Sequence, residues 1–313
     1  MRNCLCCYRP LTKKEQDFHA ACSRKLFGQP TPPELPYAET ELEPLAKEVI
    51  QSQTAVTGVQ AKLSLHITGS NKEGAPRRFT IVGLWGGYIM KPPAVNYPQL
   101  PEVEDLSMHL AAAAGIKTAP HCLIRMQSGN LAYITQRIDR TKKGKLAMED
   151  MCQLTERLTE DKYHGSYEQI AKAVLKYSAT PVLDVVNFFE LVVFSFITGN
   201  ADMHLKNFAL LEQPGLGMVL SPAYDLVNTA LVNPADNEEM ALTLNGRKNK
   251  LKKQDFVTAM SNLKLDERQQ HNIFSKMERA LPEWLQWVDA SFLTAAHKEE
   301  YKSIIQERMR RLQ

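Results

Sequence analysis

The order of apolar and polar positions predicts a β-rich first half. Over residues 60–68 apolar side chains alternate with polar ones, which is the period-2 pattern of a half-buried strand. Further short strands are predicted at 79–82, 88–91, 122–126 and 131–138. A helical pattern over 103–114 stops at Gly115, a residue type that commonly ends helices.

The second half is mostly helical, with one interruption. Helical patterns cover 167–177, 182–198, 253–260, 267–279 and 295–312. Between them, 208–211 and 218–220 predict a short hairpin across Pro214-Gly215. A β-rich half followed by a helical half with one embedded hairpin is the layout of an α+β, two-lobed, protein-kinase-like fold.

The most apolar stretch, residues 183–198, predicts a buried core helix rather than a membrane span. It is 16 residues long and contains Asp184, Asn187 and Glu190, whereas a bilayer-spanning helix needs roughly 20 apolar residues. The first ten residues carry Arg and three Cys but no long apolar core, so we expect no secretory signal. These features predict a cytoplasmic protein that makes no membrane contact.

Charge and cysteine content bear on the class of protein, and proline content indicates how the chain is divided into segments. The net charge is only +3, which gives no electrostatic argument for direct nucleic-acid binding. Six cysteines without a secretory signal favour reduced thiols. Five prolines over 29–44 predict an extended linker. The expected parts are an N-terminal segment and linker at 1–44, a first lobe at 45–138 and a helical lobe at 139–313.

The strongest chemical signal is the loop at 199–207 (GNADMHLKN), together with Asp225. The loop directly follows the buried helix, and the predicted hairpin then returns the chain to Asp225. Phosphoryl transfer from ATP needs a carboxylate that accepts the proton of the attacking hydroxyl, and oxygen ligands that hold Mg²⁺ on the phosphates. Asp202 is the candidate base, and Asn207 and Asp225 are the candidate Mg²⁺ ligands.

Two more residues of this loop have candidate catalytic roles. Lys206 is a candidate contact for the γ-phosphate in the transition state. His204 is a candidate brace for the loop through a hydrogen bond, and for this residue a structural role is favoured. The alternative for the whole set is a polar surface loop.

A kinase also needs a cation on its β-rich lobe. Lys91 closes the predicted strand 88–91 and is followed by two prolines, which resembles the nucleotide-phosphate lysine of kinases. An exposed lysine at a strand end is the alternative. The acidic partner is expected to be Glu102 or Glu104, near the start of the next helix, and the sequence does not choose between them.

The segment 54–62 is the candidate phosphate-covering loop, because its backbone N–H groups precede the first strand and could cradle phosphate. The candidate nucleotide contacts in it are Thr57, Gly58, Val59, Gln60 and Lys62. The segment holds a single glycine, so an ordinary turn is the better interpretation when it is taken alone.

Taken together, these segments resemble the HipA family of bacterial serine/threonine kinases, the toxins of toxin–antitoxin modules. The matching segments are TGVQAKLSL at 57–65, YIMKPP at 88–93, QRIDR at 136–140, MEDMCQ at 148–153, GNADMHLKNFALL at 199–211 and LSPAYDL at 220–226. The resemblance implies a kinase-like fold and transfer of the ATP γ-phosphate to a protein Ser or Thr, with aminoacyl-tRNA synthetases as the substrate class. It also assigns Gln136 and Ile138 to the nucleotide site.

The same resemblance implies regulation and partners. Autophosphorylation is expected in the loop before the first strand, where Thr57, Thr54 and Ser52 are the candidate acceptors. About 50 residues precede that loop, fewer than in a full-length HipA, so the chain resembles the shorter HipT kinase of three-component systems. In those systems HipS is a separate protein and HipB is the DNA-binding partner. HipS-like and HipB-like antitoxins are therefore the expected partners.

Two other functions stay open. The Asp-x-His-x-x-Asn core at 202–207 also resembles the catalytic loop of phosphatidylinositol kinases, which leaves a lipid or small-molecule kinase as an alternative. A nucleotide-binding pseudokinase that serves as a partner module is the second alternative. It would need a broken catalytic set, whereas Lys91, Asp202, Asn207 and Asp225 are all present.

The N-terminal segment carries a separate candidate site, for Zn²⁺. Cys4-x-x-Cys7 and His19-x-x-Cys22 supply three thiols and one imidazole, the ligand types that tetrahedral zinc prefers. A short segment with little core would gain folding free energy from such a site. The additional thiol of Cys6 blurs the pattern, and free thiols packed on the first lobe are the alternative.

Overall fold

The computed structural model describes residues 2–42, 44, 62–69, 77–83 and 85–313, and it divides into two compact units. Unit 1 contains the described residues up to Asp105, with 119–138 and 290–292. Unit 2 contains 106–118, 139–289 and 293–313. Helix α3 (Leu100–Ala113) contributes its first turns to unit 1 and the remainder to unit 2.

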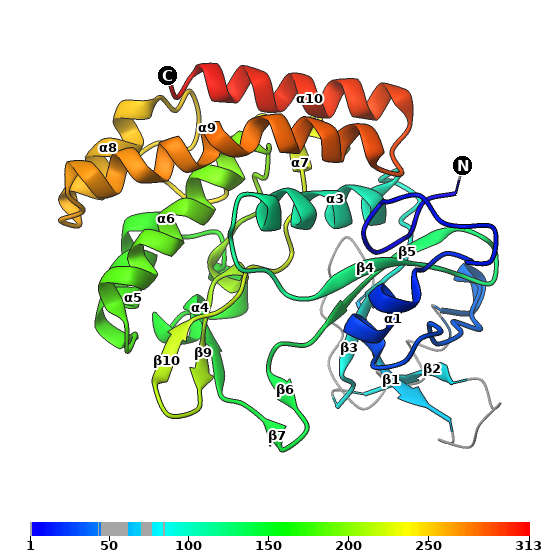
Figure 1. Ribbon diagram of the computed structural model, residues 1–313. Coiled ribbons are helices and arrows are strands. Elements are labelled where there is room, and N and C mark those ends of the chain that lie inside the picture. The colour runs from blue at the N-terminus through cyan, green and yellow to red at the C-terminus, as the bar shows by residue number, and fades with distance from the viewer. Residues whose placement is uncertain (1, 43, 45–61, 70–76, 84) are drawn as a thin grey trace. The chain divides into compact units, whose positions relative to one another are not determined.

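Unit 1 is built on an antiparallel five-stranded sheet in the order β2-β1-β3-β5-β4 (Figure 1). Its strands are β1 (Leu63–Thr68), β2 (Arg78–Val82), β3 (Tyr88–Lys91), β4 (His121–Arg125) and β5 (Leu131–Gln136). The register places Lys91, the last residue of β3, opposite Tyr133 of β5. Strand β4 forms one edge of the sheet, so its outer backbone groups need a partner from elsewhere in the chain.

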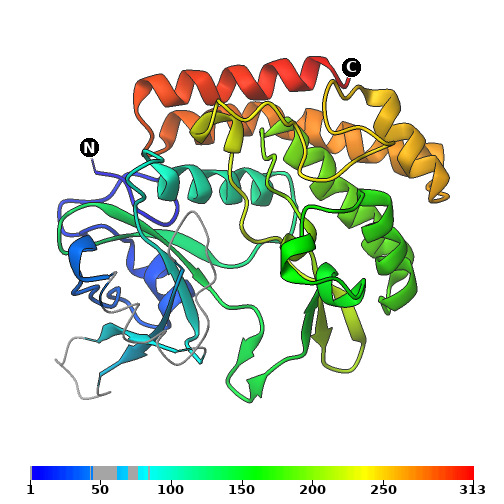
Figure 2. The same cartoon turned by 180° about the vertical axis from the view of Figure 1, so that it is seen from behind.

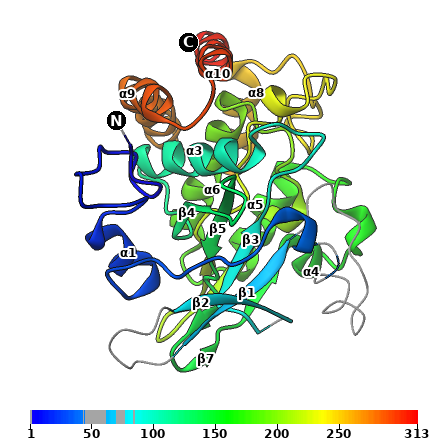
Figure 3. The same cartoon turned by 90° about the vertical axis from the view of Figure 1, so that its right-hand side faces the viewer.

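The N-terminal segment packs on this sheet through helix α1 (Ala20–Phe27), which Figure 3 shows beside the strands. Phe27 meets Phe79 of β2 edge-on, with ring centres 5.7 Å apart, and its ring centre lies 6.0 Å from that of Tyr88 in β3. The Tyr88 hydroxyl donates to the Leu26 carbonyl at 2.9 Å. The helix stops at Gly28, whose φ of 73° is easily reached by glycine.

Unit 2 is mainly helical. Its longer helices are α5 (Tyr167–Tyr177), α6 (Pro181–Ile197), α8 (Lys253–Asn262), α9 (Glu267–Ala290) and α10 (Ala295–Arg310). Helices α9 and α10 lie side by side and run in opposite directions (Figures 1 and 2). The short helices are α4 (Met151–Leu154) and α7 (Thr229–Val232), and single 3₁₀ turns form η1 (Thr159–Asp161) and η2 (Leu205–Asn207).

Helix α6 lies at the buried centre of unit 2. Pro181 occupies its first turn, where a missing N–H breaks no helical hydrogen bond. Asp184 is buried there and accepts hydrogen bonds from the Leu220 N–H at 2.8 Å and the Thr180 hydroxyl at 3.1 Å. Nearly every side chain from Phe188 to Ile197 is buried, which explains why this helix reads as a continuous apolar run.

A small sheet combines one strand that precedes α6 in the chain with two that follow it. It has the order β10-β9-β8 and consists of β8 (Met148–Asp150), β9 (Ala209–Gln213) and β10 (Gly217–Leu220). Strands β6 (Arg140–Thr141) and β7 (Gly144–Lys145) form a separate two-stranded ribbon. Since η2 is separated from β9 only by Phe208, the loop at 199–207 is held between a buried helix and a paired strand.

The differences from the predicted elements have physical causes. The strand predicted at 60–68 is described from Leu63 onward, since residues 60 and 61 lie outside the described part of the chain. Helix α9 does not stop at residue 279 but continues through Pro282 to Ala290, because Trp284 and Val288 bury their side chains. Strand β8 was missed because three residues carry no periodic signal.

Among the helices that the structure describes, none combines the length and the apolar content that crossing a bilayer requires. This agrees with the interpretation of residues 183–198 as a core helix. The first turn of α6 carries Asp184, whose buried carboxylate accepts hydrogen bonds from three groups outside the helix.

Candidate functional site

The loop at 199–207 leaves α6 through a turn that only glycine accommodates well. Gly199 has a φ of 74°, and a Cβ at this position would lie 2.6 Å from Asn228 Oδ1 and 3.1 Å from Ile304 Cγ2. Any larger residue would therefore combine a left-handed backbone with a close contact. This turn fixes the direction in which the loop leaves the helix.

Thr229, the first residue of α7, fastens the start of the loop. Its hydroxyl donates to the Gly199 carbonyl at 3.1 Å and accepts from the Ala201 N–H at 2.7 Å. The Ala230 N–H donates to the same carbonyl at 3.0 Å. Sequence reasoning missed Thr229, because nothing in the sequence pairs it with a loop that precedes it by about 30 residues.

Asp202 and Asn207, the candidate base and metal ligand, are joined within the loop. Asn207 Nδ2 donates to the Asp202 backbone carbonyl at 2.9 Å, so the amide oxygen of Asn207 is the atom that a metal would bind. The Asp202 N–H donates to Asn200 Oδ1 at 3.1 Å. Asn207 is buried, whereas Asp202 is half-buried and can be reached by an acceptor.

Tyr163 contacts the candidate base directly. Its hydroxyl donates to Asp202 Oδ1 at 2.6 Å, and 41% of the residue is exposed. Burial raises the pKa of Tyr163, and the hydrogen bond to Asp202 and the charges of Asp202 and Asp225 raise it further. The hydroxyl therefore stays protonated and remains a donor at ordinary pH. No motif in the sequence pointed to this residue.

His204 packs against Tyr163. Its ring meets the Tyr163 ring edge-on at 5.0 Å and 82°. Its backbone N–H donates to the Asp202 carbonyl at 2.8 Å, but within the described part of the chain its buried Nδ1 has no hydrogen-bond partner. Burial lowers the pKa of His204, which favours the uncharged ring. The histidine thus packs in the loop, and the bracing hydrogen bond comes from its backbone.

Lys206 points to acidic and hydroxyl groups of neighbouring elements. Its Nζ lies 3.3 Å from Thr159 Oγ1 in η1 and 3.7 Å from Asp150 Oδ2 at the end of β8. The side chain is 38% exposed, so this ammonium is accessible and only loosely paired. Neither Thr159 nor Asp150 was predicted as a neighbour of the loop.

Asp225 is tied to the loop through the residue before it. The Tyr224 hydroxyl donates to the Lys206 carbonyl at 3.0 Å. Asp225 itself is half-buried and has a φ of 60°, a conformation that aspartate tolerates better than most residues. Its charge acts on both Tyr163 and His204, as does that of Asp202. Both carboxylates therefore belong to one electrostatic site within unit 2.

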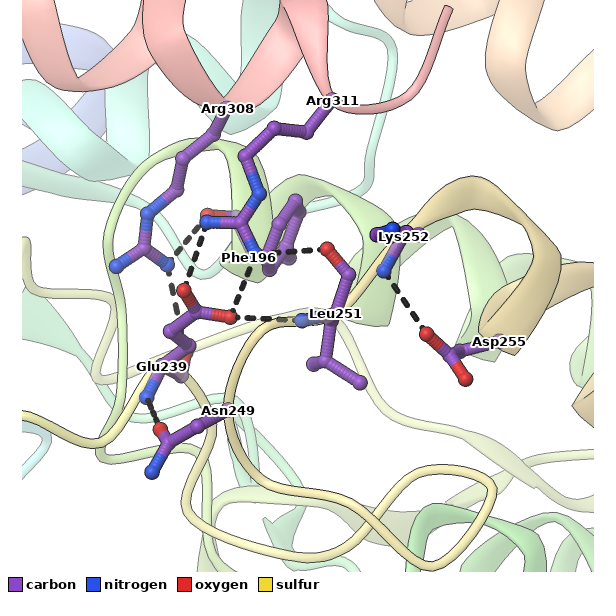
Figure 4. Close-up of polar contacts among 8 residues, drawn as sticks. All are labelled: Phe196, Glu239, Asn249, Leu251, Lys252, Asp255, Arg308 and Arg311. Atoms are coloured by element: carbon purple, nitrogen blue, oxygen red, sulfur yellow. Dashed lines mark hydrogen bonds and ion pairs between the residues drawn. The ribbon is translucent and has the colours of Figure 1, made fainter.

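The C-terminal helix holds the end of α6 from which this loop emerges (Figure 4). Arg308 is buried, and its Nη1 donates to the Phe196 carbonyl at 2.9 Å. Arg311 forms a two-pronged ion pair with Glu239 at 2.7 and 2.9 Å. Both guanidinium groups lie over the Phe196 ring, 5.2 and 5.1 Å from its centre. The two arginines near the C-terminus therefore stabilise the end of α6.

Lys91 and Glu104 form a buried ion pair in unit 1. Lys91 Nζ lies 2.5 Å from Glu104 Oε1, and the side chains are 5% and 0% exposed. Lys91 also lies 5.5 Å from the centre of the Tyr133 ring. Glu102 is the other candidate partner, and burial raises its pKa to about 6. The structure thus selects Glu104 as the partner, an alternative that the sequence left open.

The other predicted nucleotide contacts are only partly described. Thr57, Gly58, Val59 and Gln60, and the acceptor candidates Ser52 and Thr54, lie outside the described residues. Lys62 is exposed just before β1. Gln136 is the last residue of β5, and Ile138 is the last residue of that part of unit 1; both are half-buried.

Comparisons with known proteins show what this chain is similar to. The family model of the HipA-like C-terminal domain matches residues 54–285. A Haemophilus influenzae protein named "Putative kinase" is 27% identical over 74% of this chain and 69% of its own length. The chain spans 69% of the length of that relative, and 50% and 40% of the length of two putative kinases of Sinorhizobium fredii, to each of which it is 31% identical.

Two solved structures show the fold. The Shewanella oneidensis HipA, solved with HipB and operator DNA, superposes with a TM-score of 0.68 at 20% identity, over 88% of this chain and 71% of that one. The Helicobacter pylori kinase CtkA gives a TM-score of 0.53 at 14% identity, over 72% and 86%. The predicted α+β, kinase-like fold is confirmed.

The anchor of α6 leads to a stability prediction. Burial acts to raise the pKa of Glu239, but hydrogen bonds from Arg311 and the Leu251 N–H, with the charges of Arg311 and Arg308, bring it below its ordinary value. Glu239→Gln should lower the free energy of unfolding by about 1–3 kcal/mol at neutral pH. Because the folded-state pKa is lowered, this stabilisation is present above about pH 4.3 and is lost as pH falls through the lower folded-state value.

Chemical denaturation at several pH values measures this effect. Glu299→Gln is the matched control, since its side chain is 76% exposed and pairs with Lys302 on the surface, and it should leave stability unchanged. An equal loss in both variants, or a Glu239→Gln effect that persists at acid pH, would contradict the role given to the ion pair.

Proposed function

This chain belongs to the HipA-like C-terminal domain family, and we propose that it is a kinase that transfers the γ-phosphate of ATP to a serine or threonine of a protein. One observation carries the proposal: Asp202 and Asn207 are joined in one loop, and Asp225 is tied to that loop through Tyr224. In protein kinases a base, a metal-binding amide and a metal-binding carboxylate occur in this order around a hairpin.

Asp202 would act as the general base. In the proposed step its carboxylate takes the proton of the acceptor hydroxyl, the hydroxyl oxygen forms a bond to the γ-phosphorus, and the bond to the bridging oxygen of ADP breaks. The half-buried position of Asp202, in the loop that follows the buried helix α6, suits this role, because a base must reach the substrate from a fixed position. Lys206 is accessible enough to turn toward the transferred phosphate.

Asn207 and Asp225 would hold Mg²⁺, which supplies positive charge at the phosphates when bound. The donor set fits this ion, since an amide oxygen and a carboxylate are hard ligands. The left-handed backbone of Asp225 agrees with a functional position, because such conformations cluster at ligand sites. On the other lobe, Lys91 would contact the nucleotide phosphates, and Glu104 would orient it.

The resemblance to HipA kinases supports a role as a cytoplasmic toxin kinase of the HipT type, with an aminoacyl-tRNA synthetase as the substrate. The Shewanella neighbour was solved with HipB, which supports a HipB-like antitoxin as a partner here. A HipS-like partner stays a prediction from the resemblance to HipT. Autophosphorylation at Thr57, Thr54 or Ser52 stays a prediction. It is tested by mass spectrometry of the protein after incubation with Mg-ATP.

The first test of the proposal removes the base. Asp202→Asn keeps the shape of the side chain but not its basicity, so phosphate transfer should fall by roughly 10²–10⁴-fold. The measurement is transfer of labelled phosphate from ATP to proteins of a cell lysate, followed by identification of the labelled bands. The matched control is Asp266→Asn, an exposed residue whose cap hydrogen bond to Gln269 an asparagine preserves. Activity of Asp202→Asn within threefold of wild type would remove Asp202 from the mechanism.

A second test addresses the metal ligand. Asp225→Asn removes a negative charge that would face Mg²⁺, so the dissociation constant for Mg-nucleotide should rise, whereas binding of the nucleotide without metal should change little. Calorimetric titration with and without Mg²⁺ separates the two. A dissociation constant for Mg-nucleotide that equals that of the wild type would mean that Asp225 is not a ligand.

A third test concerns Tyr163, which places a hydroxyl on the oxygen of Asp202 that an acceptor hydroxyl would use. Tyr163→Phe should therefore lower KM for the protein acceptor by about fivefold, the equivalent of one net hydrogen bond of about 1 kcal/mol, and leave KM for ATP unchanged. Tyr177→Phe is the control, because it removes an exposed hydroxyl that, among the described residues, is hydrogen-bonded only to Lys176. A fall in kcat at constant KM would instead assign Tyr163 to orienting the base.

A further inference from the structure

The thiols of the N-terminal segment converge on one point. The ligand atoms of Cys4, Cys7, His19 and Cys22 all lie within 4.8 Å of one another. His19 Nδ1 lies 3.3 Å from Cys7 Sγ and 3.9 Å from Cys22 Sγ. For a tetrahedral zinc ion with Zn–S of about 2.3 Å and Zn–N of about 2.0–2.1 Å, the sulfur–nitrogen separation is about 3.5 Å. The two distances bracket this value.

The chain geometry supplies the four groups from two short elements. Cys4 and Cys7 lie in a tight turn in which the Tyr8 N–H donates to the Cys4 carbonyl at 2.9 Å, and Tyr8 has a φ of 59°. His19 is the N-cap of α1, and Cys22 follows it by three residues, so both side chains point to the same side of the helix start. Two residues separate Cys4 from Cys7, and two separate His19 from Cys22, a spacing that suits a compact zinc site.

The surroundings of His19 favour a metal over a set of free thiols. Its Nε2 lies 3.1 Å from the Pro10 carbonyl, a group that only accepts, so Nε2 carries the proton and the lone pair of Nδ1 faces the sulfur atoms. Metal-binding histidines almost always donate their second ring nitrogen in this way. The His19 side chain makes no capping hydrogen bond, although it occupies the N-cap, and its backbone N–H lies 3.4 Å from Cys4 Sγ.

We propose that Cys4, Cys7, His19 and Cys22 bind one structural Zn²⁺ ion. Zinc with three thiolates and one imidazole has no open coordination position, so a structural role fits better than a catalytic one. The proposal is independent of the kinase chemistry, because every group that it uses lies in unit 1 and none was assigned to ATP or Mg²⁺.

Such an ion would fasten the N-terminal segment to the edge of the sheet. The Leu5 carbonyl accepts from the Leu123 N–H of edge strand β4 at 3.0 Å. Asp17 forms an ion pair with Arg125 of the same strand at 2.9 Å. The Tyr8 hydroxyl donates to buried Asp105 at 2.7 Å. Since the turn and the start of α1 supply both the metal ligands and these contacts, loss of zinc would release the segment that covers β4.

Metal analysis of the full chain tests the proposal. Protein purified without added metal, freed of any affinity tag and dialysed against a weak chelator should hold one zinc per chain by elemental analysis. Cys7→Ser and His19→Ala should each reduce that ratio severalfold. Cys6→Ser is the matched control, since it removes a neighbouring thiol that is not one of the four groups, and it should retain one zinc.

Two further readouts keep the test decisive if a variant fails to fold. Wild-type protein reconstituted with Co²⁺ should show the intense visible bands of a tetrahedral site with thiolate ligands. Stripping zinc with a strong chelator should lower the melting temperature and make the edge of β4, around Leu123, exchange its amide hydrogens faster.

A zinc ratio near zero in the wild type, with Cys4, Cys7 and Cys22 reacting with a thiol reagent as fast as free cysteine, would overturn the proposal. A Cys6→Ser variant that loses zinc as completely as Cys7→Ser would overturn the assignment of the four ligands. Retention of one zinc in a folded Cys7→Ser or His19→Ala variant would do the same.

Discussion

The arrangement of the candidate site depends on how the last turn of α6 is held. The final carbonyl groups of a helix lack partners within the helix, and buried ones must find them elsewhere. Here the Phe196 carbonyl accepts from the Gly199 N–H and from Arg308, and Arg311 and Glu239 close the arrangement around the Phe196 ring (Figure 4). The helix end is therefore fixed by charge and by packing, within a unit whose core is mainly apolar.

From this fixed end the chain can present polar groups without losing their positions. Gly199 sets the direction of the loop, Thr229 fastens its start, and Asn207 closes it onto the Asp202 carbonyl. Tyr224 then ties the next carboxylate to the same loop. Phosphoryl transfer relies on positioning and charge more than on covalent chemistry, and a loop fixed by several hydrogen bonds between two regular elements meets that need.

The sequence predicted the parts of this account that depend on local pattern. The alternation at 60–68 predicted β1, other short apolar runs predicted further strands, and the long apolar run predicted α6. The order of Asp202, Asn207 and Asp225 singled out the candidate site. It could not give the groups that act across long chain separations: Tyr163 on Asp202, Thr229 on Gly199 and Arg308 on Phe196 carry no periodic or motif signal. Nor could it decide between Glu102 and Glu104, because both lie near the start of α3 and only packing separates them.

In the proposed site, Asn207 and Asp225 hold a metal ion on the phosphates of a nucleotide, beside Asp202. The most direct test is an experimental structure of the full chain with Mg²⁺ and a non-hydrolysable ATP analogue. We expect an ion that lies about 2.0–2.1 Å from Asn207 Oδ1 and from an Asp225 carboxylate oxygen and contacts phosphate oxygens, with the γ-phosphate facing Asp202. A nucleotide whose metal ion contacts neither residue, or whose γ-phosphate lies away from Asp202, would contradict it.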